Sequence, residues 1–282
     1  MTALISPVTA DKAAKVALWV SAGIALLILA VILGYIVVQG VHVITLSFLL
    51  ESPRLSGAEG GILPAIVGTF WLMVVAMLSS VPIGIGAAVY LAEYAPKSAV
   101  TAVISFGVEC LAGVPSIVIG LFGYAFLSIY LGFGFSVLSG GLALMFMVLP
   151  WIVRVSEESI KTVPNAFREA SLALGATKWQ TVRRVVLPSA IPGITTGVIL
   201  GIGKAIGETA VIMFTAGSSL LMPMSLLDPV RALPYHIYIL ASEGISNPMA
   251  YGSSIVLLAM VLAINLAAIA IQRHYGRHYV RN

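Results

Sequence analysis

Three ionisable side chains, Glu109, Lys204 and Glu208, lie inside long apolar stretches of the chain. A charge at the centre of a membrane-spanning helix costs about 2.5 to 3.5 kcal/mol, so such a residue usually faces a cavity or an opposite charge. Lys204 and Glu208 are four residues apart, which predicts that they share one face of a helix. The three could neutralise one another and pin two helices together, or they could line a path for a charged solute. The residues alone leave both interpretations open.

The sequence patterns that carry most enzyme chemistry are missing from the chain. A nucleotide-binding loop needs G-x-x-x-x-G-K-[ST], but around Gly203 and Lys204 the first glycine position holds Val198 and the last position holds Ala205. The four histidines show no spacing typical of a metal site: His42, His236, His274 and His278. No nucleophile lies beside a base in a recognisable pattern. We therefore expect a non-enzymatic chain with no catalytic residues, no metal site and no cofactor of its own.

Composition indicates that the chain is embedded in a membrane. Of its 282 residues, 60% are hydrophobic and only 9% are charged, and the mean hydropathy is +1.06. A soluble domain needs far more charge on its surface. Apolar segments at residues 16–38, 63–92, 99–130, 142–153, 191–216 and 251–271 predict an all-α, polytopic bundle of six transmembrane helices. The formal net charge of +4 is not gathered into a basic patch, so we expect no nucleic-acid partner.

The apolar segments divide the chain into four parts. These are a cytoplasmic tail at 1–15, a first transmembrane helix at 16–38, a core of five further transmembrane helices at 63–272 and a cytoplasmic basic tail at 273–282. Six crossings put both termini and the connections 93–98 and 154–188 on one side of the membrane. By the positive-inside rule this is the cytoplasmic side, because it carries twelve of the fifteen Lys and Arg residues. The twelve are Lys12, Lys15, Lys97, Arg154, Lys161, Arg168, Lys178, Arg183, Arg184, Arg273, Arg277 and Arg281.

Individual residues predict how some segments fold. The third segment is longer than one straight crossing, which fits a bent or tilted helix, and Pro82 predicts a kink or break in the second. Gly193, Gly197 and Gly201 fall four residues apart in the fifth segment, where small residues let a helix pack closely against its neighbours. Cys110 is the single cysteine of the chain and lies in an apolar run, so we expect a buried, inert thiol.

The longest polar interruption, from Pro164 to Pro188, is patterned as two short helices. Pro164 suits the first turn of a helix, and Gly175 stands where a left-handed residue would end that helix. Thr177 and Gln180 form a capping-box signature that starts a second helix, which we expect to end at Pro188. The pattern predicts an ordered helical hairpin, called the 164–188 hairpin below. On these residues alone it could also be an ordinary amphipathic hairpin at the membrane surface.

This hairpin resembles the EAA loop of permease subunits in ATP-driven (ABC) importers, the binding-protein-dependent transport permeases. That loop reads E-A-A, three residues, G, nine residues and I-x-L-P; this chain has Ser171 for the second Ala and Val185 for the Ile. The resemblance implies the all-α core of a type I (MetI-like) ABC importer permease, whose loop docks into a separate ATPase subunit and carries its motion to the membrane helices. The residues implied for this coupling are Glu169, Ala170, Ser171, Gly175, Leu187 and Pro188. Arg168 and Lys178, by contrast, are expected on a solvated face of the hairpin.

Three further segments resemble permease subunits of the phosphate-specific (Pst) importers within that class. The segments are E-C-L-A-G-V-P-S-I at 109–117, K-A-I-G-E-T-A at 204–210 and L-P-Y-H-I-Y at 233–238. Where this chain has Lys204, those permeases have Arg or Lys, and Cys110 stands where Thr is frequent. The resemblance implies that Lys204 contacts phosphate transiently, and that Glu208 and Glu109 control the charge and position of Lys204.

The same resemblance implies the setting in which the chain works. It would be a multi-pass protein of a prokaryotic cell membrane, surrounded by lipid, with both termini cytoplasmic. It would form a heterodimer with a second permease subunit, together with two copies of a cytoplasmic ATPase that carry the ATP and Mg, and an extracytoplasmic phosphate-binding protein.

Other functions stay open at this point. Within the same class, the chain could be the sister permease subunit of that importer or a permease for another oxyanion. A proton-coupled secondary carrier would instead use Glu109, Lys204 and Glu208 as a relay. A membrane scaffold would tolerate neutral residues at Lys204 and Glu208.

Overall fold

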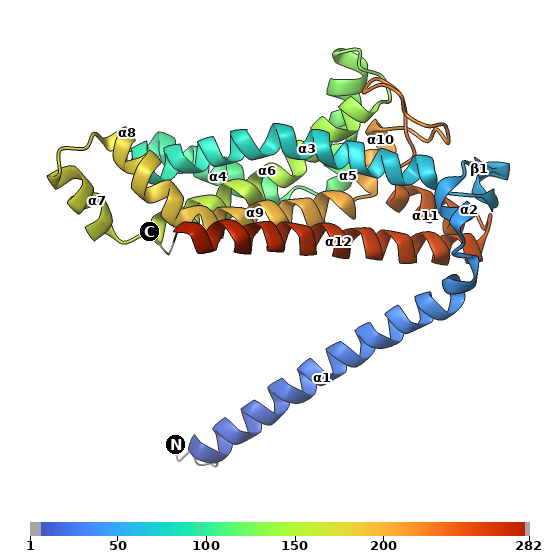
Figure 1. Ribbon diagram of the computed structural model, residues 1–282, viewed down its shortest axis with the longest axis horizontal. Helices are drawn as coiled ribbons and strands as arrows, with labels where there is room; N and C mark the ends of the chain where they lie inside the picture. The colour runs from blue at the N-terminus through green and yellow to red at the C-terminus, as the bar shows by residue number, and fades with distance from the viewer. Residues whose placement is uncertain (1–6, 97, 280–282) are drawn as a thin grey trace.

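The computed structural model describes residues 7–96 and 98–279. Within them, five helical stretches are long and apolar enough to cross a membrane, and a bent pair of helices makes a sixth crossing if it is counted as one span. The long helices are α1 (Pro7–Gly40), α3 (Leu63–Val89), α6 (Val137–Lys161), α9 (Leu187–Ile206) and α12 (Asn247–Tyr279). The bent pair is α4 (Ala99–Gly113) with the stretch Ser116–Tyr130, which consists of α5 (Ser116–Gly123) and η4 (Tyr124–Tyr130). This architecture confirms the predicted helical membrane bundle (Figure 1).

Shorter elements join the long helices. They are η1 (Val41–Val43), α2 (Leu46–Leu50), β1 (Pro53–Arg54), η2 (Leu55–Gly57), β2 (Glu59–Gly60), η3 (Tyr90–Tyr94), η4 (Tyr124–Tyr130), α7 (Asn165–Ala173), α8 (Lys178–Thr181), η5 (Val182–Val186), α10 (Ala210–Thr215) and α11 (Leu233–Ser242). The two short strands pair antiparallel and were not anticipated from the sequence. In Figure 1 the two ends of the chain lie toward the same end of the long axis as α7, while α2, β1 and α11 lie at the other end.

Helix α6 lies at the centre of the core because glycine lets its neighbour α3 come close. A Cβ added to Gly141 of α6 would lie 2.5 Å from the Cβ of Val75 on α3, and a Cβ on Gly84 of α3 would lie 2.7 Å from Ile152 of α6. Larger residues at either glycine would therefore push the helices apart. Most of the buried side chains of the main core come from α6 and from the helices packed on it.

Helix α9 packs on α6 through the glycines that the sequence singled out. A Cβ on Gly193 would overlap the Ser159 side chain, and a Cβ on Gly197 would lie 3.0 Å from the Cβ of Val155. Gly201 faces Ile152 in the same way. The prediction of close packing along this glycine series is confirmed.

Proline has different consequences in three of these helices. The axes of α4 and of the stretch Ser116–Tyr130 differ by 101°, with the break at Val114 and Pro115, which confirms the bend in the third segment. Helix α3, however, continues through Pro82, so a break there was a wrong prediction; transmembrane helices tolerate proline where local adjustments satisfy the freed carbonyl. Pro188 does not end a helix either. The chain runs from α8 through η5 into α9 as one helical stretch, with Pro188 in the first turn of α9, where no N–H donor is needed.

Helix α1 stands apart from the bundle and meets it only near its C-terminal end (Figure 1). At that end, a Cβ on Gly40 would lie 2.6 Å from the backbone of Tyr251, and the rings of Tyr35 and Tyr251 meet edge to face at 5.6 Å. Within its hydrophobic stretch none of the described residues is buried. Its apolar surface therefore needs lipid or another protein around it.

The chain ends are more helical than the expected tails. Helix α1 begins at Pro7, inside the expected tail 1–15, and α12 runs to Tyr279, inside the expected tail 273–282. Residues 1–6 and 280–282, and with them Arg281, lie outside the described residues, as does Lys97.

Candidate functional site

The 164–188 hairpin has the glycine turn between two helical segments that its sequence predicted, although the second segment continues into α9. Gly175 has a φ of +83°, a conformation that favours glycine, and a Cβ there would meet no atom within 4 Å. The Thr177 hydroxyl accepts a hydrogen bond from the Gln180 N–H at 3.3 Å, and the Gln180 side chain accepts one from the Thr177 N–H at 2.8 Å. These contacts fix the turn, so the hairpin is an ordered element.

The residues proposed for coupling occupy two different environments. Glu169, Ala170 and Gly175 are exposed on the hairpin. Ser171 is half-buried, and its hydroxyl lies 2.9 Å from the Thr181 hydroxyl, which ties α7 to α8. Leu187 and Pro188 are half-buried where α9 starts; Leu187 packs on the small core at that end of the bundle. The first group is free to contact a partner, and the last two anchor the hairpin.

Large apolar side chains stand exposed on the hairpin. Their exposed fractions are 51% for Phe167, 49% for Leu172, 90% for Leu174 and 56% for Trp179. Exposed apolar groups gathered on one small element mark a contact with another protein or a membrane. Leu174 follows the last residue of α7 and lies beside the Gly175 turn.

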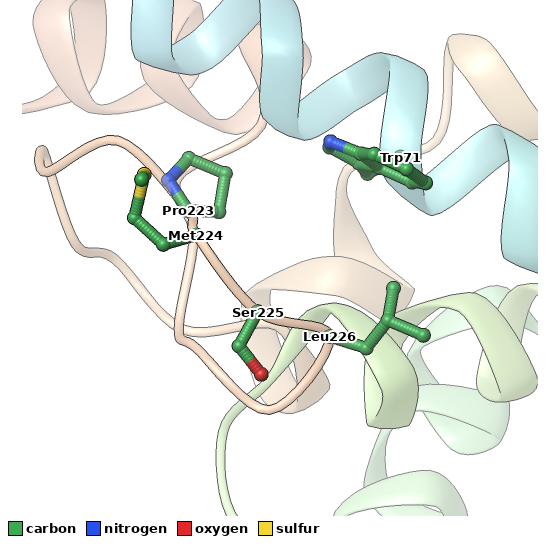
Figure 2. Close-up of a pocket in the computed structure, with 5 residues that line it drawn as sticks. All are labelled: Trp71, Pro223, Met224, Ser225 and Leu226. Carbon is green, nitrogen blue, oxygen red and sulfur yellow. The ribbon is translucent and has the colours of Figure 1, made fainter.

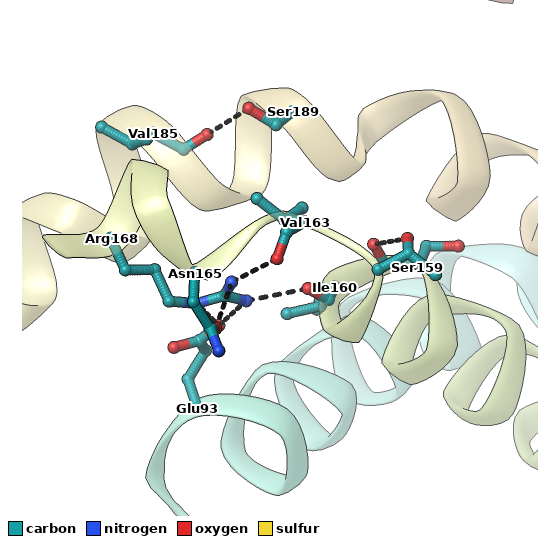
Figure 3. Close-up of polar contacts among 9 residues, drawn as sticks. Glu93, Ser159, Ile160, Val163, Asn165, Arg168, Val185 and Ser189 are labelled. Carbon is teal, nitrogen blue, oxygen red and sulfur yellow. Dashed lines mark hydrogen bonds and ion pairs between the residues drawn. The ribbon is translucent and has the colours of Figure 1, made fainter. Parts of the chain in front are cut away.

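Arg168 holds α7 to the bundle, contrary to the prediction that it lies on a solvated face. Its Nη2 lies 2.6 Å from Oε1 of Glu93 in η3, and its Nε donates to the same oxygen at 3.0 Å (Figure 3). It also donates from Nη1 to the Val163 carbonyl at 2.5 Å and from Nη2 to the Ile160 carbonyl at 2.9 Å. The two charged side chains are only 18% and 8% exposed. Because 75 residues separate Glu93 from Arg168, no local pattern pointed to this pair.

Lys178 also makes a contact that the sequence did not predict. Its Nζ lies 4.8 Å from the centre of the Tyr94 ring, next to Glu93 in η3. Lys178 is nevertheless exposed, as expected for a solvated face, so that prediction is wrong for Arg168 alone. The hairpin rests on η3 through Arg168 on α7 and Lys178 on α8.

Lys204 and Glu208 do not share a helix face, so that prediction is wrong. Helix α9 ends at Ile206, and Glu208 lies in the break before α10, where its Oε1 accepts a hydrogen bond from the Ala210 N–H at 3.1 Å. Lys204 is exposed, and its Nζ lies 4.6 Å from the centre of the Trp151 ring on α6. In the part of the chain that the structure describes, neither Glu208 nor Glu109 forms an ion pair with Lys204.

Glu109 pairs with Arg154 instead of Lys204, and this arginine was missed as a site residue. Arg154 Nη2 contacts Glu109 of α4 and donates to the Ser105 carbonyl at 2.8 Å, while Nη1 lies 3.1 Å from Glu157. Glu157 is 5% exposed and also binds Lys161 at 2.6 Å. The sequence had placed Arg154 in a cytoplasmic connection, but α6 continues to Lys161 and carries it inside the helix. Arg154 lies three residues after Trp151, on the same helix face, and this spacing could have identified it as a site residue.

Cys110 is exposed on α4, and the expected buried thiol is therefore wrong. No residue of α4 is buried in the described chain, because the helix contacts the bundle through only part of its surface. The apolar run around Cys110 thus indicates a membrane or protein contact rather than a core position.

A pocket lies at the opposite end of the bundle from the hairpin. It has a volume of about 300 Å³ and lies between Trp71 of α3 and the loop residues Pro223, Met224, Ser225 and Leu226 (Figure 2). Its lining carries no ionisable side chain, so it does not suit a charged solute. In the described residues no group of three His, Cys, Asp or Glu side chains could hold a metal ion.

Comparison with protein families places the chain. Residues 80–281 match the family described as "Binding-protein-dependent transport system inner membrane component". The chain belongs to this family. As a member of this transport family, it is a permease component rather than an enzyme, and its apolar helices make it a multi-pass membrane protein.

Curated relatives of this transport family match most of the chain. It is 38% identical over 274 residues to the "Probable ABC transporter permease protein YqgI" of Bacillus subtilis, covering 92% of this chain and 93% of that one. It is 39% identical over 220 residues to the "Phosphate transport system permease protein PstA 1" of Mycobacterium tuberculosis (76% and 70% covered). The PstA protein of Pasteurella multocida is 36% identical over 241 residues (84% and 85% covered).

Solved transporter structures share the fold of this family member. An inward-facing methionine ABC transporter, MetNI, matches with a TM-score of 0.65 and 21% identity over 76% of this chain and 95% of that one. A bacterial alginate ABC transporter, in complex with an alginate-bound periplasmic protein, matches with a TM-score of 0.66 and 16% identity over 95% of both chains. The bundle is therefore a MetI-like permease core of the type I importers.

Proposed function

We propose that the chain is a transmembrane permease subunit of an ATP-driven phosphate importer and forms half of the translocation pathway. The observation that carries the proposal is a pair of cations on one face of the bundle: Lys204 over Trp151, and Arg154 one turn further along α6. An oxyanion crossing a low-dielectric path needs positive charges or oriented donors. Several relatives are named phosphate transport permeases.

Lys204 is suited to a transient contact because an aromatic ring, not a carboxylate, lies next to its ammonium group. A cation over a ring gains about 0.5 to 2 kcal/mol and keeps its N–H donors free for another acceptor. A close carboxylate would instead neutralise the charge. Lys204 would therefore move from Trp151 to a phosphate oxygen as the cargo passes, and return when the cargo leaves.

The two glutamates have separate roles in this proposal. Glu109 balances Arg154 and joins α4 to α6, so it controls the second cation rather than Lys204. Glu208 caps the first turn after the break between α9 and α10, so it sets the backbone that follows Lys204. The carboxylate beside Arg154 prevents this cation from trapping the anion.

The 164–188 hairpin is the surface through which a separate ATPase would drive the bundle. Glu169 and Ala170 are exposed on α7, and Leu174 is the most exposed of the large apolar residues on the hairpin. Gly175 gives the turn, and the stretch from Ser171 through Leu187 and Pro188 leads directly into α9. Closure of the ATPases would press on this surface and rock α9, which carries Lys204.

The partners follow from the same proposal. The chain would pair with a second permease subunit, which supplies the other half of the pathway and covers the exposed face around Lys204. Two copies of a cytoplasmic ATPase would supply ATP and Mg, and an extracytoplasmic phosphate-binding protein would deliver the cargo. Both termini and the hairpin would lie on the cytoplasmic side.

Phosphate uptake by the complete complex in proteoliposomes tests this function. Lys204→Ala should reduce uptake at least tenfold, about 1.4 kcal/mol, while the complex still assembles. Lys15→Ala, which removes an exposed cation paired with Asp11 on α1, is the matched control and should leave uptake unchanged. Normal phosphate uptake by an assembled Lys204→Ala complex would contradict the role of Lys204.

Two measurements distinguish the remaining functions: which oxyanion the complex transports, and whether transport requires ATP. If wild-type complexes move another oxyanion and not phosphate, the chain serves that oxyanion. Uptake that survives ATP depletion while a proton gradient persists would favour a secondary carrier. The exposed, ordered 164–188 hairpin favours the ATP-driven importer, because a carrier has no need of such a docking surface.

A further inference from the structure

We propose that Glu93 and Arg168 are positioning residues that connect the 164–188 hairpin to α3, as a second mechanical link beside the covalent one into α9. This inference rests on the proposed function, in which an ATPase moves the hairpin. It assigns no contact with the cargo or the ATPase to either residue.

Helix α7 has no apolar anchor in the bundle. None of its residues is buried, and its large apolar side chains are exposed. The polar contacts of Arg168 are therefore the main attachment of α7. The guanidinium binds Glu93 with Nε and Nη2, and it also donates to the Ile160 carbonyl in the last turn of α6 and to the Val163 carbonyl just after it (Figure 3).

These contacts bring three elements together at one side chain. Arg168 belongs to α7, Glu93 to η3 at the end of α3, and the Ile160 carbonyl to the last turn of α6. Both side chains are largely shielded from water, at 18% and 8% exposed, so the ion pair is screened much less than a surface pair. A planar guanidinium also fixes orientation, because its donors form a rigid fork.

A second contact supports the same connection. Lys178 on α8 lies over the Tyr94 ring, one residue after Glu93. A crevice of about 430 Å³ opens among Glu93, Arg168, Leu172, Lys178 and neighbouring residues, so these groups are joined across a gap and not by dense packing. Specific polar contacts, rather than packing, must therefore transmit a displacement of the hairpin to η3.

Helix α3 is placed to pass that displacement inward. It packs on α6 without clearance at Gly84 and Gly141, so its movement must shift α6 and the Trp151 and Arg154 side chains on it. Both η3, which ends α3 and contacts the hairpin, and η5, through which the hairpin continues into α9, are π-helical. Such turns recur at functional sites and interrupt regular helical bonding, which gives each link a place to adjust.

The test uses the whole importer in proteoliposomes and measures phosphate transported per ATP hydrolysed. Glu93→Gln and Arg168→Gln should each lower this ratio about fivefold to tenfold, the range of typical coupling energies, while ATP hydrolysis continues. The exchanged pair Glu93→Arg with Arg168→Glu should recover part of the loss. Glu51→Gln, which breaks the exposed pair with Arg54 at the other end of the bundle, is the matched control and should leave the ratio unchanged.

A distance measurement separates positioning from simple loss of structure. Spin labels at Leu174→Cys on the hairpin and Tyr90→Cys on η3, in a Cys110→Ser background, should give one narrow distance distribution with and without ATP. In Glu93→Gln the distribution should broaden. If neutral variants fail to assemble, Arg168→Lys keeps the charge without the planar fork and should show the same broadening.

The outcomes are distinct. A narrow distribution and a normal ratio in Glu93→Gln, or in Arg168→Lys where only that variant assembles, would overturn the proposal. A large ATP-dependent change of the label distance in the complex that retains Glu93 and Arg168 would overturn it as well. If the wild-type complex moves no phosphate, the proposed function fails, and the distance distributions still decide the connection.

Discussion

The ammonium group of Lys204 lies 4.6 Å from the centre of the Trp151 ring, so the last turn of α9 is connected to α6 by a cation and an aromatic face. Neither residue is buried in the chain. These two residues and Arg154 therefore lie on one side of the bundle. Because it carries charges, this side would be the hardest to expose to lipid. The pathway proposed above, shared with a second permease, would account for that exposure, because charged groups within membranes face cavities or partners.

Replacement of Trp151 tests whether its ring holds the Lys204 ammonium group in the working complex. Trp151→Leu removes the aromatic face, worth about 0.5 to 2 kcal/mol to the cation, and should alter the phosphate concentration for half-maximal uptake several-fold. Trp151→Phe retains a ring and should lie between Trp151→Leu and wild type. Uptake kinetics in proteoliposomes measure both. Identical kinetics for all three chains would show that the ring does not hold Lys204 in the working complex.

Arg154 should matter more for stability than its partner Glu109. Arg154→Ala leaves the largely buried Glu157 with Lys161 alone and should lower the free energy of unfolding by about 1 to 3 kcal/mol. Glu109→Gln affects a carboxylate that is 65% exposed and should cost less than about 1 kcal/mol. Thermal unfolding of the purified chain in detergent gives the comparison. Equal losses would mean that Glu157 does not depend on Arg154.

Gly175 should be sensitive to backbone strain and not to size. A side chain has room there, but its φ of +83° disfavours any residue with a Cβ by about 1 to 2 kcal/mol. Gly175→Ala should therefore lower phosphate transported per ATP, and Gly175→Asn should do so less, since Asn tolerates left-handed conformations. Gly23→Ala, at a helical glycine of α1 with open space around it, is the control. A Gly175→Ala complex with normal coupling would show that coupling does not depend on the left-handed turn at this position.

Local sequence signals predicted the elements that depend on neighbouring residues. The 164–188 hairpin follows from Gly175 and the Thr177 and Gln180 capping box, which act within a few residues. The bend of the third span was expected from its length, and the structure places it at Val114 and Pro115. Each of these signals acts on residues that are close to it in the sequence.

Contacts between distant segments could not be predicted in this way. The pairs of Arg168 with Glu93 and of Arg154 with Glu109 depend on how α3, α4, α6 and α7 pack, which no single segment specifies. The error over Lys204 and Glu208 has a different origin. A four-residue spacing indicates a common face only while the helix continues, and Gly207 between them was a sign that it ends.

His236 should make the fold sensitive to acid. Its side chain in α11 is fully buried, and neither ring nitrogen has a hydrogen-bond partner among the residues that the structure describes. Burial, and then the nearby positive charge of Arg231, lower the pKa of His236 from 6.5 to about 4. Above pH 6.5 the ring is neutral in both the folded and the unfolded chain. Between pH 6.5 and 4 the unfolded chain binds a proton that the folded chain does not, so stability must fall as the pH falls.

The expected loss across that pH range is about 3 kcal/mol, from a pKa difference of about 2.5 and 1.36 kcal/mol per unit. Unfolding of the detergent-solubilised chain, followed between pH 7.5 and 4, measures it as the change in unfolding free energy. His236→Leu removes two unpaired nitrogens and should flatten this part of the pH profile. His42→Leu, at an exposed histidine in η1, should leave the profile as it is. An unchanged profile in His236→Leu would assign the acid sensitivity to carboxylates elsewhere in the chain.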